Sequence, residues 1–134
     1  MIEVELSRII IDEKKQEQII VLREKNGEKV LPIVIGIGEA AAIRMQLSGF
    51  KPPRPLTHDL MKSLIETFSL TLERVVIDKL VDSTFHAKLY FRASDGTTKI
   101  VDARPSDSIA LAVRTKSPIF VQEEVFEKLL MGDQ

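Results

Sequence analysis

The fold of this chain is organised around one stretch, Asp102-Ala-Arg-Pro-Ser-Asp-Ser-Ile-Ala-Leu-Ala-Val-Arg114. A strand is predicted to end where the stretch begins, and Pro105 favours the first turn of a helix, where its missing N–H has no helical partner to lose. Residues 106–108 can cap free backbone N–H groups, and residues 109–113 predict a helix buried on nearly every side. This turn therefore holds two carboxylates and one guanidinium at the edge of a core: Asp102, Asp107 and Arg104.

Upstream of this turn, the first 35 residues predict three antiparallel strands. Residues 2–6 alternate apolar and polar side chains, which indicates a strand with one wet face. The alternation slips afterwards, so we expect a bulge near Ser7-Arg8 or burial of both faces. Asn26-Gly27 between two β-rich runs predicts a hairpin. Pro32 in the third run cannot donate to a ladder, which indicates an edge position or a bulge.

Two helices are predicted next, on either side of a proline-rich loop. Residues 40–47 repeat apolar side chains at helical spacing, and Gly49 marks the stop. Residues 51–55 cannot form a helix or a central strand because of their prolines. Thr57 is the predicted N-cap of the second helix, in which the apolar side chains of residues 60–68 form a stripe expected to face the core.

The rest of the chain predicts four more strands and two helices. The strands are residues 70–80, 85–92, 97–101 and 119–121, with a turn at Asp95-Gly96, and the last helix places Val125, Phe126, Leu129 and Leu130 on its apolar side. The order β, β, β, α, α, β, β, β, α, β, α predicts one α+β domain over residues 1–134, with a largely antiparallel or mixed sheet and about four helices.

Composition limits the classes of function. A net charge of -1 means that any attraction to nucleic acid must come from a local patch. The absence of cysteine excludes disulfides and cysteine-ligated zinc. No signal peptide is visible and no apolar run approaches the roughly 18 residues of a membrane span, so we expect a cytoplasmic protein without membrane contact. Few asparagines and no cysteine favour a thermostable protein.

Several common enzyme sites are missing from the sequence. Gly36-Ile-Gly38 supplies two glycines of a dinucleotide fingerprint, but Ala41 stands where the third is required. There is no phosphate-binding P-loop, no serine nucleophile elbow and no His-Glu-x-x-His zinc motif. These absences exclude most familiar nucleotide-dependent and hydrolytic classes.

A segment with a similar pattern of residues occurs earlier in the chain. Arg54-Pro55 precedes Thr57 and Asp59 much as Arg104-Pro105 precedes its own polar residues. Each segment puts a guanidinium just before a helix N-terminus, where free N–H groups and the helix dipole favour an anion. If the two helix ends converge, they form a pocket for a phosphate group.

These residues suggest metal-dependent cleavage of a phosphodiester, in which Mg²⁺ or Mn²⁺ activates water. Arg54 and Arg104 are the candidate phosphate ligands, and His58 would assist proton transfer beside Asp102 and Asp107. The candidate metal ligands are Asp102, Asp107, Asp59 and Glu39. His86 is a weaker candidate, on a strand face that could follow a nucleic-acid backbone or simply face water: His86, Lys88, Tyr90 and Arg92.

A non-catalytic interpretation stays open beside this one. First-turn acids are usually caps or dipole partners, and a neighbouring arginine is usually an ion-pair partner. In that case the same Arg, Asp and His side chains would form a buried network that locks the two Arg-Pro turns together, in a module that binds an anion or a protein.

Three blocks of this sequence resemble the bifunctional nuclease domain, a family found in bacteria, archaea and plants. The blocks are Leu31-Pro-Ile-Val-Ile-Gly36 with Glu39-Ala40, Pro53-Arg-Pro-Leu-Thr-His-Asp-Leu60, and Asp102-Ala-Arg-Pro-Ser-Asp-Ser-Ile-Ala-Leu-Ala112. The resemblance covers nearly the whole chain and implies a compact α+β domain that forms homo-oligomers and cleaves DNA and RNA, the activity reported for plant members. It also implies a role for the polar positions of the three blocks, which this chain keeps: Glu39, Arg54, His58, Asp59, Asp102, Arg104 and Asp107.

Overall fold

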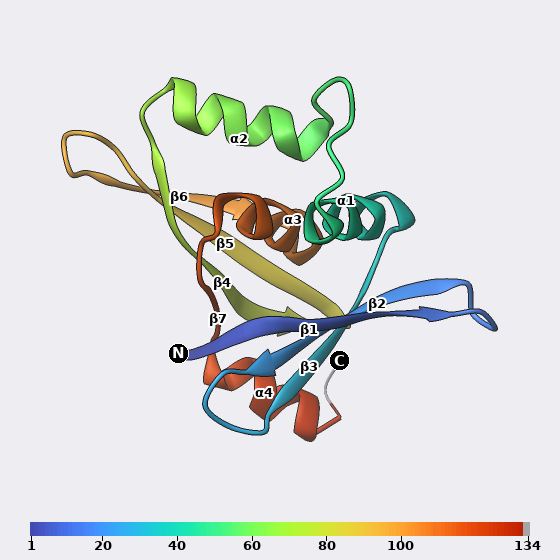
Figure 1. Ribbon diagram of the computed structural model, residues 1–134. Helices are drawn as coiled ribbons and strands as arrows, with labels where there is room; N and C mark the ends of the chain where they lie inside the picture. The colour runs from blue at the N-terminus through green and yellow to red at the C-terminus, as the bar shows by residue number, and fades with distance from the viewer. Residues whose placement is uncertain (133–134) are drawn as a thin grey trace.

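Strands and helices follow one another in the order that the sequence predicts. The structure is a computed structural model that describes residues 1–132 (Figure 1). Its elements are β1 (Ile2–Asp12), β2 (Glu17–Glu24), β3 (Val30–Ile35), α1 (Ile37–Ser48), α2 (Thr57–Thr67), β4 (Thr71–Val81), β5 (Thr84–Arg92), β6 (Thr98–Ala103), α3 (Pro105–Thr115), β7 (Ile119–Val121) and α4 (Glu123–Leu130). The predicted α+β class, mixed sheet and four helices are confirmed.

The strands form one seven-stranded sheet in the order β3-β2-β1-β7-β4-β5-β6. Its centre is β7, where Ile119 pairs antiparallel with Val4 of β1 and parallel with Val75 of β4. The short C-terminal strand thus joins two antiparallel halves of the sheet. Strand alternation predicts that a strand exists but not which strands it joins, so this central position could not be predicted.

Irregular positions in the strands lie where the sequence indicates them. The register between β1 and β2 shifts between Leu6 and Arg8, which confirms the predicted bulge. Strand β3 is an edge of the sheet, so Pro32 lacks an N–H at a place where the sheet tolerates it. The Asn26-Gly27 and Asp95-Gly96 turns connect the antiparallel pairs β2–β3 and β5–β6, as predicted.

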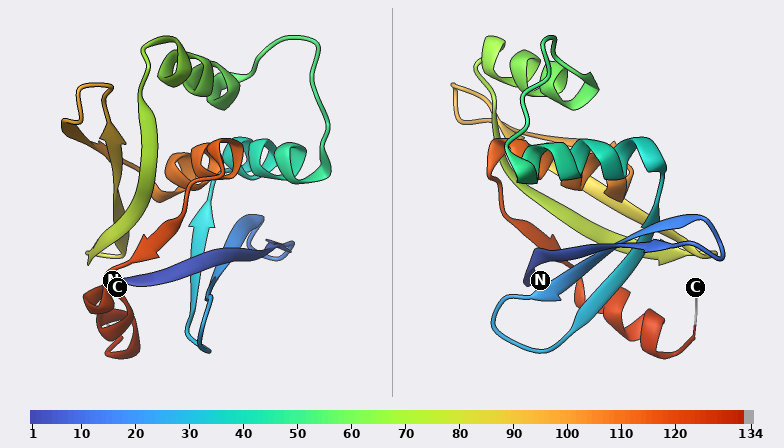
Figure 2. Two further views of the ribbon diagram at one scale, coloured as in Figure 1. Left: turned by 60° about the vertical axis from the view of Figure 1, so that its left-hand side comes forward. Right: turned by 45° about the vertical axis from the view of Figure 1, so that its right-hand side comes forward.

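Helices α1, α2 and α3 lie on one side of the sheet and α4 lies on the other (Figures 1 and 2). Helix α3 contacts α1, α2 and the strands β4 and β5, so it is enclosed on nearly every side, as predicted. Its side chains Ile109 and Leu111 are fully buried. Of residues 1–132, no helix is long and apolar enough to cross a membrane.

Helix α2 differs from its prediction in two ways. Its N-cap is Leu56, and Thr57 is the first helical residue. Of the predicted apolar stripe, only Ile65 is buried and Met61 is partly buried, whereas Leu60, Leu64 and Phe68 are exposed. The reason is its position: α2 is the outermost layer and packs chiefly on α3 (Figure 1).

Helix α4 buries a narrower stripe than the sequence predicts. Val125 and Phe126 are buried and Leu129 packs partly against the core, but Leu130 is exposed. The helix packs against β4 with one edge, so the last residue of the predicted stripe faces solvent.

Candidate functional site

Three helices begin next to one another, and each carries an acidic residue at its third position. These residues are Glu39 in α1, Asp59 in α2 and Asp107 in α3. The N-caps Gly36, Leu56 and Arg104 donate no side-chain cap, so the first-turn carboxylates meet the positive ends of the helix dipoles. The helix starts of α2 and α3 lie together, which was the condition for a phosphate pocket, and α1 begins beside them.

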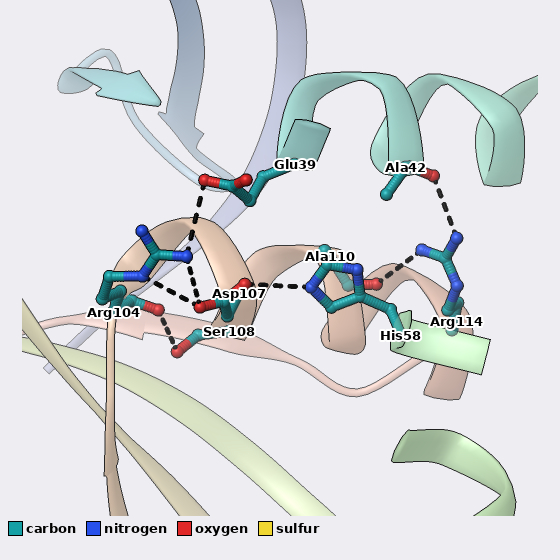
Figure 3. Close-up of polar contacts among 8 residues, drawn as sticks. All are labelled: Glu39, Ala42, His58, Arg104, Asp107, Ser108, Ala110 and Arg114. Carbon is teal, nitrogen blue, oxygen red and sulfur yellow. Dashed lines mark hydrogen bonds and ion pairs between the residues drawn. The ribbon is translucent and has the colours of Figure 1, made fainter. Parts of the chain in front are cut away.

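Arg104 and Asp107 are the centre of this arrangement (Figure 3). Asp107 Oδ2 accepts a hydrogen bond of 3.0 Å from Arg104 Nε and lies 2.8 Å from Nη2. On its other side, Asp107 Oδ1 lies 3.0 Å from Nε2 of the buried His58 of α2. Arg104 Nη2 also lies 3.6 Å from Glu39 Oε1 of α1. A continuous chain of polar contacts, here called the Arg104 cluster, thus links His58, Asp107, Arg104 and Glu39.

The pKa values in this cluster follow from these contacts. Burial alone would raise the pKa of Asp107, but hydrogen bonds from His58 and Arg104 outweigh it and hold the pKa below its ordinary value. The hydrogen bond with Asp107 raises the pKa of Arg104. Asp107 is therefore a carboxylate and Arg104 a cation at neutral pH.

Glu39 lies unusually close to the start of its own helix. A Cβ atom at Gly36 would come within 2.8 Å of Glu39 Oε1, so a larger residue at position 36 would displace this carboxylate. The absence of a side chain at Gly36 therefore gives Glu39 room to reach Arg104.

Asp59 belongs to a second, separate ion pair. Its Oδ1 accepts a hydrogen bond of 2.8 Å from Nε of Arg114, whose side chain is only 3% exposed. The same guanidinium donates to the carbonyl oxygens of Ala110 and Ala42 (Figure 3). The hydrogen bond from Arg114 lowers the pKa of Asp59, and a second bond from the backbone N–H of Leu56 acts in the same direction.

Arg114 was missed as a site residue, although the sequence contains a signal for it. It stands at the end of the apolar run of α3, and a cation in a helix buried on every side needs a buried partner. The sequence does not say which carboxylate that partner is, because Asp59 precedes it by 55 residues.

Asp102 does not join either group. Its side chain is 76% exposed, and its polar contact is with Lys88 Nζ at 3.1 Å. The two residues are register partners on β6 and β5, and they alternate with the pair Leu89 and Val101. Leu89 belongs to the core beneath the helices, so Asp102 lies on the opposite face of the sheet. The expectation that Asp102 lies beside Asp107 and Arg104 fails because a strand turns successive side chains to opposite faces.

Arg54 also lies apart from the cluster. It is exposed in the loop before α2, and within residues 1–132 its side chain has no hydrogen bond or ion pair. The prolines restrict the backbone of this loop but provide no hydrogen-bond partner for the Arg54 side chain. Of the two predicted guanidinium groups, the structure places only Arg104 in the polar cluster.

The strand face around His86 carries paired charges. Lys88 contacts Asp78 and Asp102, and Arg92 lies 2.9 Å from Glu73. Tyr90 is covered by Arg74, whose guanidinium carbon lies 4.3 Å from the ring centre. The cations of this face are thus largely matched by carboxylates, which weakens it as a nucleic-acid surface.

A cleft of about 610 Å³ opens beside the Arg104 cluster. Glu39, Arg104, Pro105 and Ser106 line it at the starts of α1 and α3. Its apolar wall was not predicted because it comes from segments far apart in the sequence: Ile19, Pro32, Ile33, Val34, Ile35, Leu80, Phe85 and Leu129. Within the cluster, Arg104 and Glu39 therefore contact the cleft, and His58 and Asp107 stand behind them.

The four predicted metal ligands do not form a preformed cage. Within the described part of the chain, no three His, Asp or Glu side chains come together as a metal site. Asp59, Asp107 and Asp102 each accept a hydrogen bond from a cationic side chain. Glu39 is the predicted ligand that lines the cleft, so the residues fit at most a Mg²⁺ or Mn²⁺ ion held by one carboxylate together with water and substrate oxygens.

Comparison with known proteins gives a family and several relatives. A family model described as "Bifunctional nuclease domain" matches residues 20–132. An uncharacterized protein of Mycobacterium tuberculosis is 44% identical over 134 residues, which cover 98% of this chain and 79% of that protein. Bifunctional nuclease 2 of Oryza sativa subsp. japonica is 30% identical over 118 residues, 86% of this chain and 36% of the plant protein. Bifunctional nuclease 1 of Arabidopsis thaliana is 27% identical over 107 residues, 78% of this chain and 33% of the plant protein. The chain thus spans about a third of the length of these plant relatives.

Proposed function

Because this chain belongs to the bifunctional nuclease domain family, we propose that it is a nuclease that hydrolyses phosphodiester bonds in DNA and RNA. The observation that carries the proposal is Arg104, a guanidinium at the rim of a cleft between two helix N-termini that lack side-chain caps. Such an arrangement suits a phosphate group, because the cation and the helix dipoles attract it and backbone N–H groups can donate to it.

The residues of the Arg104 cluster would have different roles in this reaction. Arg104 binds the scissile phosphate and stabilises the charge that grows on its oxygens in the transition state. Asp107 and His58 act behind Arg104 as positioning residues, since Asp107 bonds to Nε and Nη2 and His58 fixes Asp107 from the other side. Arg104 Nη1 is left to meet the substrate, because it has no polar partner within residues 1–132 (Figure 3).

Glu39 is the carboxylate placed to handle the attacking water. Its side chain lies at the cleft, next to Arg104. We assign it the role of general base: it accepts a proton as the water oxygen bonds to phosphorus, and the P–O bond to the leaving sugar oxygen breaks. The leaving oxygen then takes a proton from solvent.

A divalent metal is part of the proposal: one carboxylate oxygen of Glu39 would be its protein ligand, and the other would accept the proton from water. Mg²⁺ or Mn²⁺ bound there would polarise a phosphate oxygen and lower the pKa of bound water. Asp59, Asp102 and Asp107 are poorer ligands because each accepts a hydrogen bond of 2.8 to 3.1 Å from a cation, whereas Glu39 lies 3.6 Å from Arg104 Nη2.

The test is cleavage of labelled single-stranded and duplex DNA and RNA in EDTA, Mg²⁺ or Mn²⁺. We expect metal-dependent cleavage by the wild type and a loss of about 100-fold in Arg104→Gln and in Glu39→Gln, the scale seen when a transition-state donor is removed. Arg92→Gln and Glu73→Gln are matched controls, because they break an ion pair of the same kind on the strand face away from the cleft.

The controls are purified in the same way and report contaminating nucleases. Cleavage that persists equally in Arg104→Gln, with an unchanged melting temperature, would place the chemistry elsewhere. Full activity in EDTA would remove the metal from the proposal but leave the nuclease function in place.

A second candidate is a non-catalytic module that binds an anionic ligand. It is favoured by a specific observation: Asp59, Asp102 and Asp107 all pair with cations, and the pairs to Arg114 and His58 tie α2 to α3. This candidate predicts that phosphate-containing ligands bind at Arg104 and leave unchanged. Incubation of wild-type protein with labelled substrate, followed by separation of products, distinguishes the two functions.

A further inference from the structure

The cleft beside Arg104 is much larger than a phosphate group. Its volume of about 610 Å³ falls in the range of sites that enclose small organic ligands. Aliphatic side chains and one aromatic ring, Phe85, form its apolar wall. The occupant that fits therefore has a substantial apolar body in addition to any charged group.

A largely buried serine lines the same cleft. Ser106 is only 6% exposed, yet it is among the residues that line the cleft. Within residues 1–132 its hydroxyl has no hydrogen-bond partner, in contrast to Ser108 two positions further, which donates to Arg104 O. The Ser106 hydroxyl is therefore free to donate a hydrogen bond to an acceptor on a ligand in the cleft.

The same end of the cleft favours an anion. Ser106 is the second residue of α3, whose first-turn N–H groups have no helical partner, and α1 begins beside it at Gly36. Arg104 lies at the rim with Nη1 unpaired in the described chain, and Glu39 is held by Nη2 of the same arginine. The other charged lining residues come from the β1–β2 turn: Asp12, Lys15 and Glu17. Asp12 accepts hydrogen bonds from the backbone N–H groups of Lys14 and Lys15, so the Lys15 ammonium is a second cation of the cleft beside Arg104.

We propose that this cleft binds one nucleotide unit, with its phosphate at Arg104 and Ser106 and its base against Phe85 and the aliphatic wall. Bases stack on aromatic rings largely without regard to sequence, which suits a protein that acts on both DNA and RNA. The inference rests on the proposed nuclease function and names where that nuclease holds its substrate. A free mononucleotide and one unit of a strand both carry this phosphate and base.

Strand β3 offers a matched pair of variants. Val34 lines the cleft and Val30 does not, although both are exposed on the same face of this edge strand, at 56% and 49%. Val34→Glu places a bulky negative charge in the cleft, and Val30→Glu adds the same charge outside it. Ser106→Ala removes the buried hydroxyl without adding volume.

The experiment measures binding by isothermal titration calorimetry in EDTA. The probes are adenosine 5′-monophosphate, adenosine, inorganic phosphate and a deoxyadenosine pentanucleotide. We expect the monophosphate or the pentanucleotide to bind more tightly than adenosine or phosphate. Val34→Glu should weaken binding at least about tenfold and Ser106→Ala about fivefold, the latter being the effect of one lost hydrogen bond. Val30→Glu should match the wild type.

Some outcomes of this experiment identify the ligand, and others contradict the proposal. Binding of the pentanucleotide alone identifies a unit within a strand, and equal binding of the monophosphate identifies a free nucleotide as well. Phosphate that binds as tightly as the monophosphate, equal affinities of Val34→Glu and Val30→Glu, or no binding of either nucleotide probe would overturn it.

Cleavage assays on the same variants keep this inference apart from the nuclease function. If the wild type and Val34→Glu cleave equally well, the cleft is not the nucleotide site and the nuclease function stands. If the wild type binds nucleotides at the cleft but cleaves no substrate, the nucleotide site stands and the nuclease function falls.

Discussion

Arg114 of α3 donates a hydrogen bond of 2.8 Å to Asp59 of α2, although 55 residues separate them in the chain. Together with the contact between His58 and Asp107, this bond ties the first turn of α2 to α3 at two points. Helix α2 buries few apolar side chains, so polar contacts hold much of it in place. Of the predicted site residues, Asp59 thus belongs to a structural pair with Arg114, and four form the cluster at the cleft, while Arg54 and Asp102 join neither: Glu39, His58, Arg104 and Asp107.

We expect Asp59→Ala to destabilise the protein by about 3 kcal/mol, the lower part of the range for a buried ion that loses its partner, since Asp59 itself is partly exposed. Arg114 would remain buried with its charge unpaired. Thermal unfolding should show a melting temperature lower by roughly 10 °C.

The double variant Asp59→Ala/Arg114→Met is the control for this explanation. Replacing the unpaired cation with an apolar side chain of similar length should recover part of the lost stability. Hydrogen exchange should rise in α2 of the single variant more than in α3. A double variant less stable than Asp59→Ala would show that the charge of Arg114 is not the cause.

The stability contributed by Asp59 should depend on pH in one direction. Its pKa is lowered in the folded protein, so the unfolded chain binds a proton first as the pH falls below about 4. The contribution is complete above that range and disappears as the pH falls through the folded pKa. The difference in melting temperature between wild type and Asp59→Asn should therefore be equal at pH 7 and pH 5 and shrink at pH 3. A difference that stays constant down to pH 3 would contradict the ionic role.

Local chemistry made the elements of this fold predictable. Pro105, Asn26-Gly27 and the alternation of β5 each act within a few residues, and each is found where expected. The position of β7 and the partner of Arg114 depend on contacts between distant segments, which no local pattern encodes. The place of Asp102 was misjudged for another reason: closeness in sequence to Arg104 does not overcome the alternation of a strand.

Two leucines that differ in burial should contribute differently to the free energy of unfolding. Leu111 of α3 is fully buried and Leu64 of α2 is exposed, although the sequence predicts that both side chains are buried. Leu111→Ala should cost about 3 kcal/mol, since it removes buried methyl groups and leaves a cavity. Leu64→Ala should change the free energy of unfolding by less than about 0.5 kcal/mol. Urea titrations of both variants measure this, and a large loss in Leu64→Ala would mean that α2 buries this side chain in solution.

Two carboxylates that the sequence places in one site lie apart in the structure, and the variants Asp102→Asn and Glu39→Gln test which of them is needed for activity. Asp102 is exposed and paired with Lys88 on the sheet face away from α3, so its loss should cost no more than about 1 kcal/mol of stability. Glu39 lies in the cleft beside Arg104, so nuclease activity should fall far more in Glu39→Gln than in Asp102→Asn. Cleavage rates at equal folded concentration, with melting temperatures measured in parallel, give the comparison. If Asp102→Asn is fully folded and inactive while Glu39→Gln is active, catalysis takes place at the end of β6 and the cleft serves another purpose.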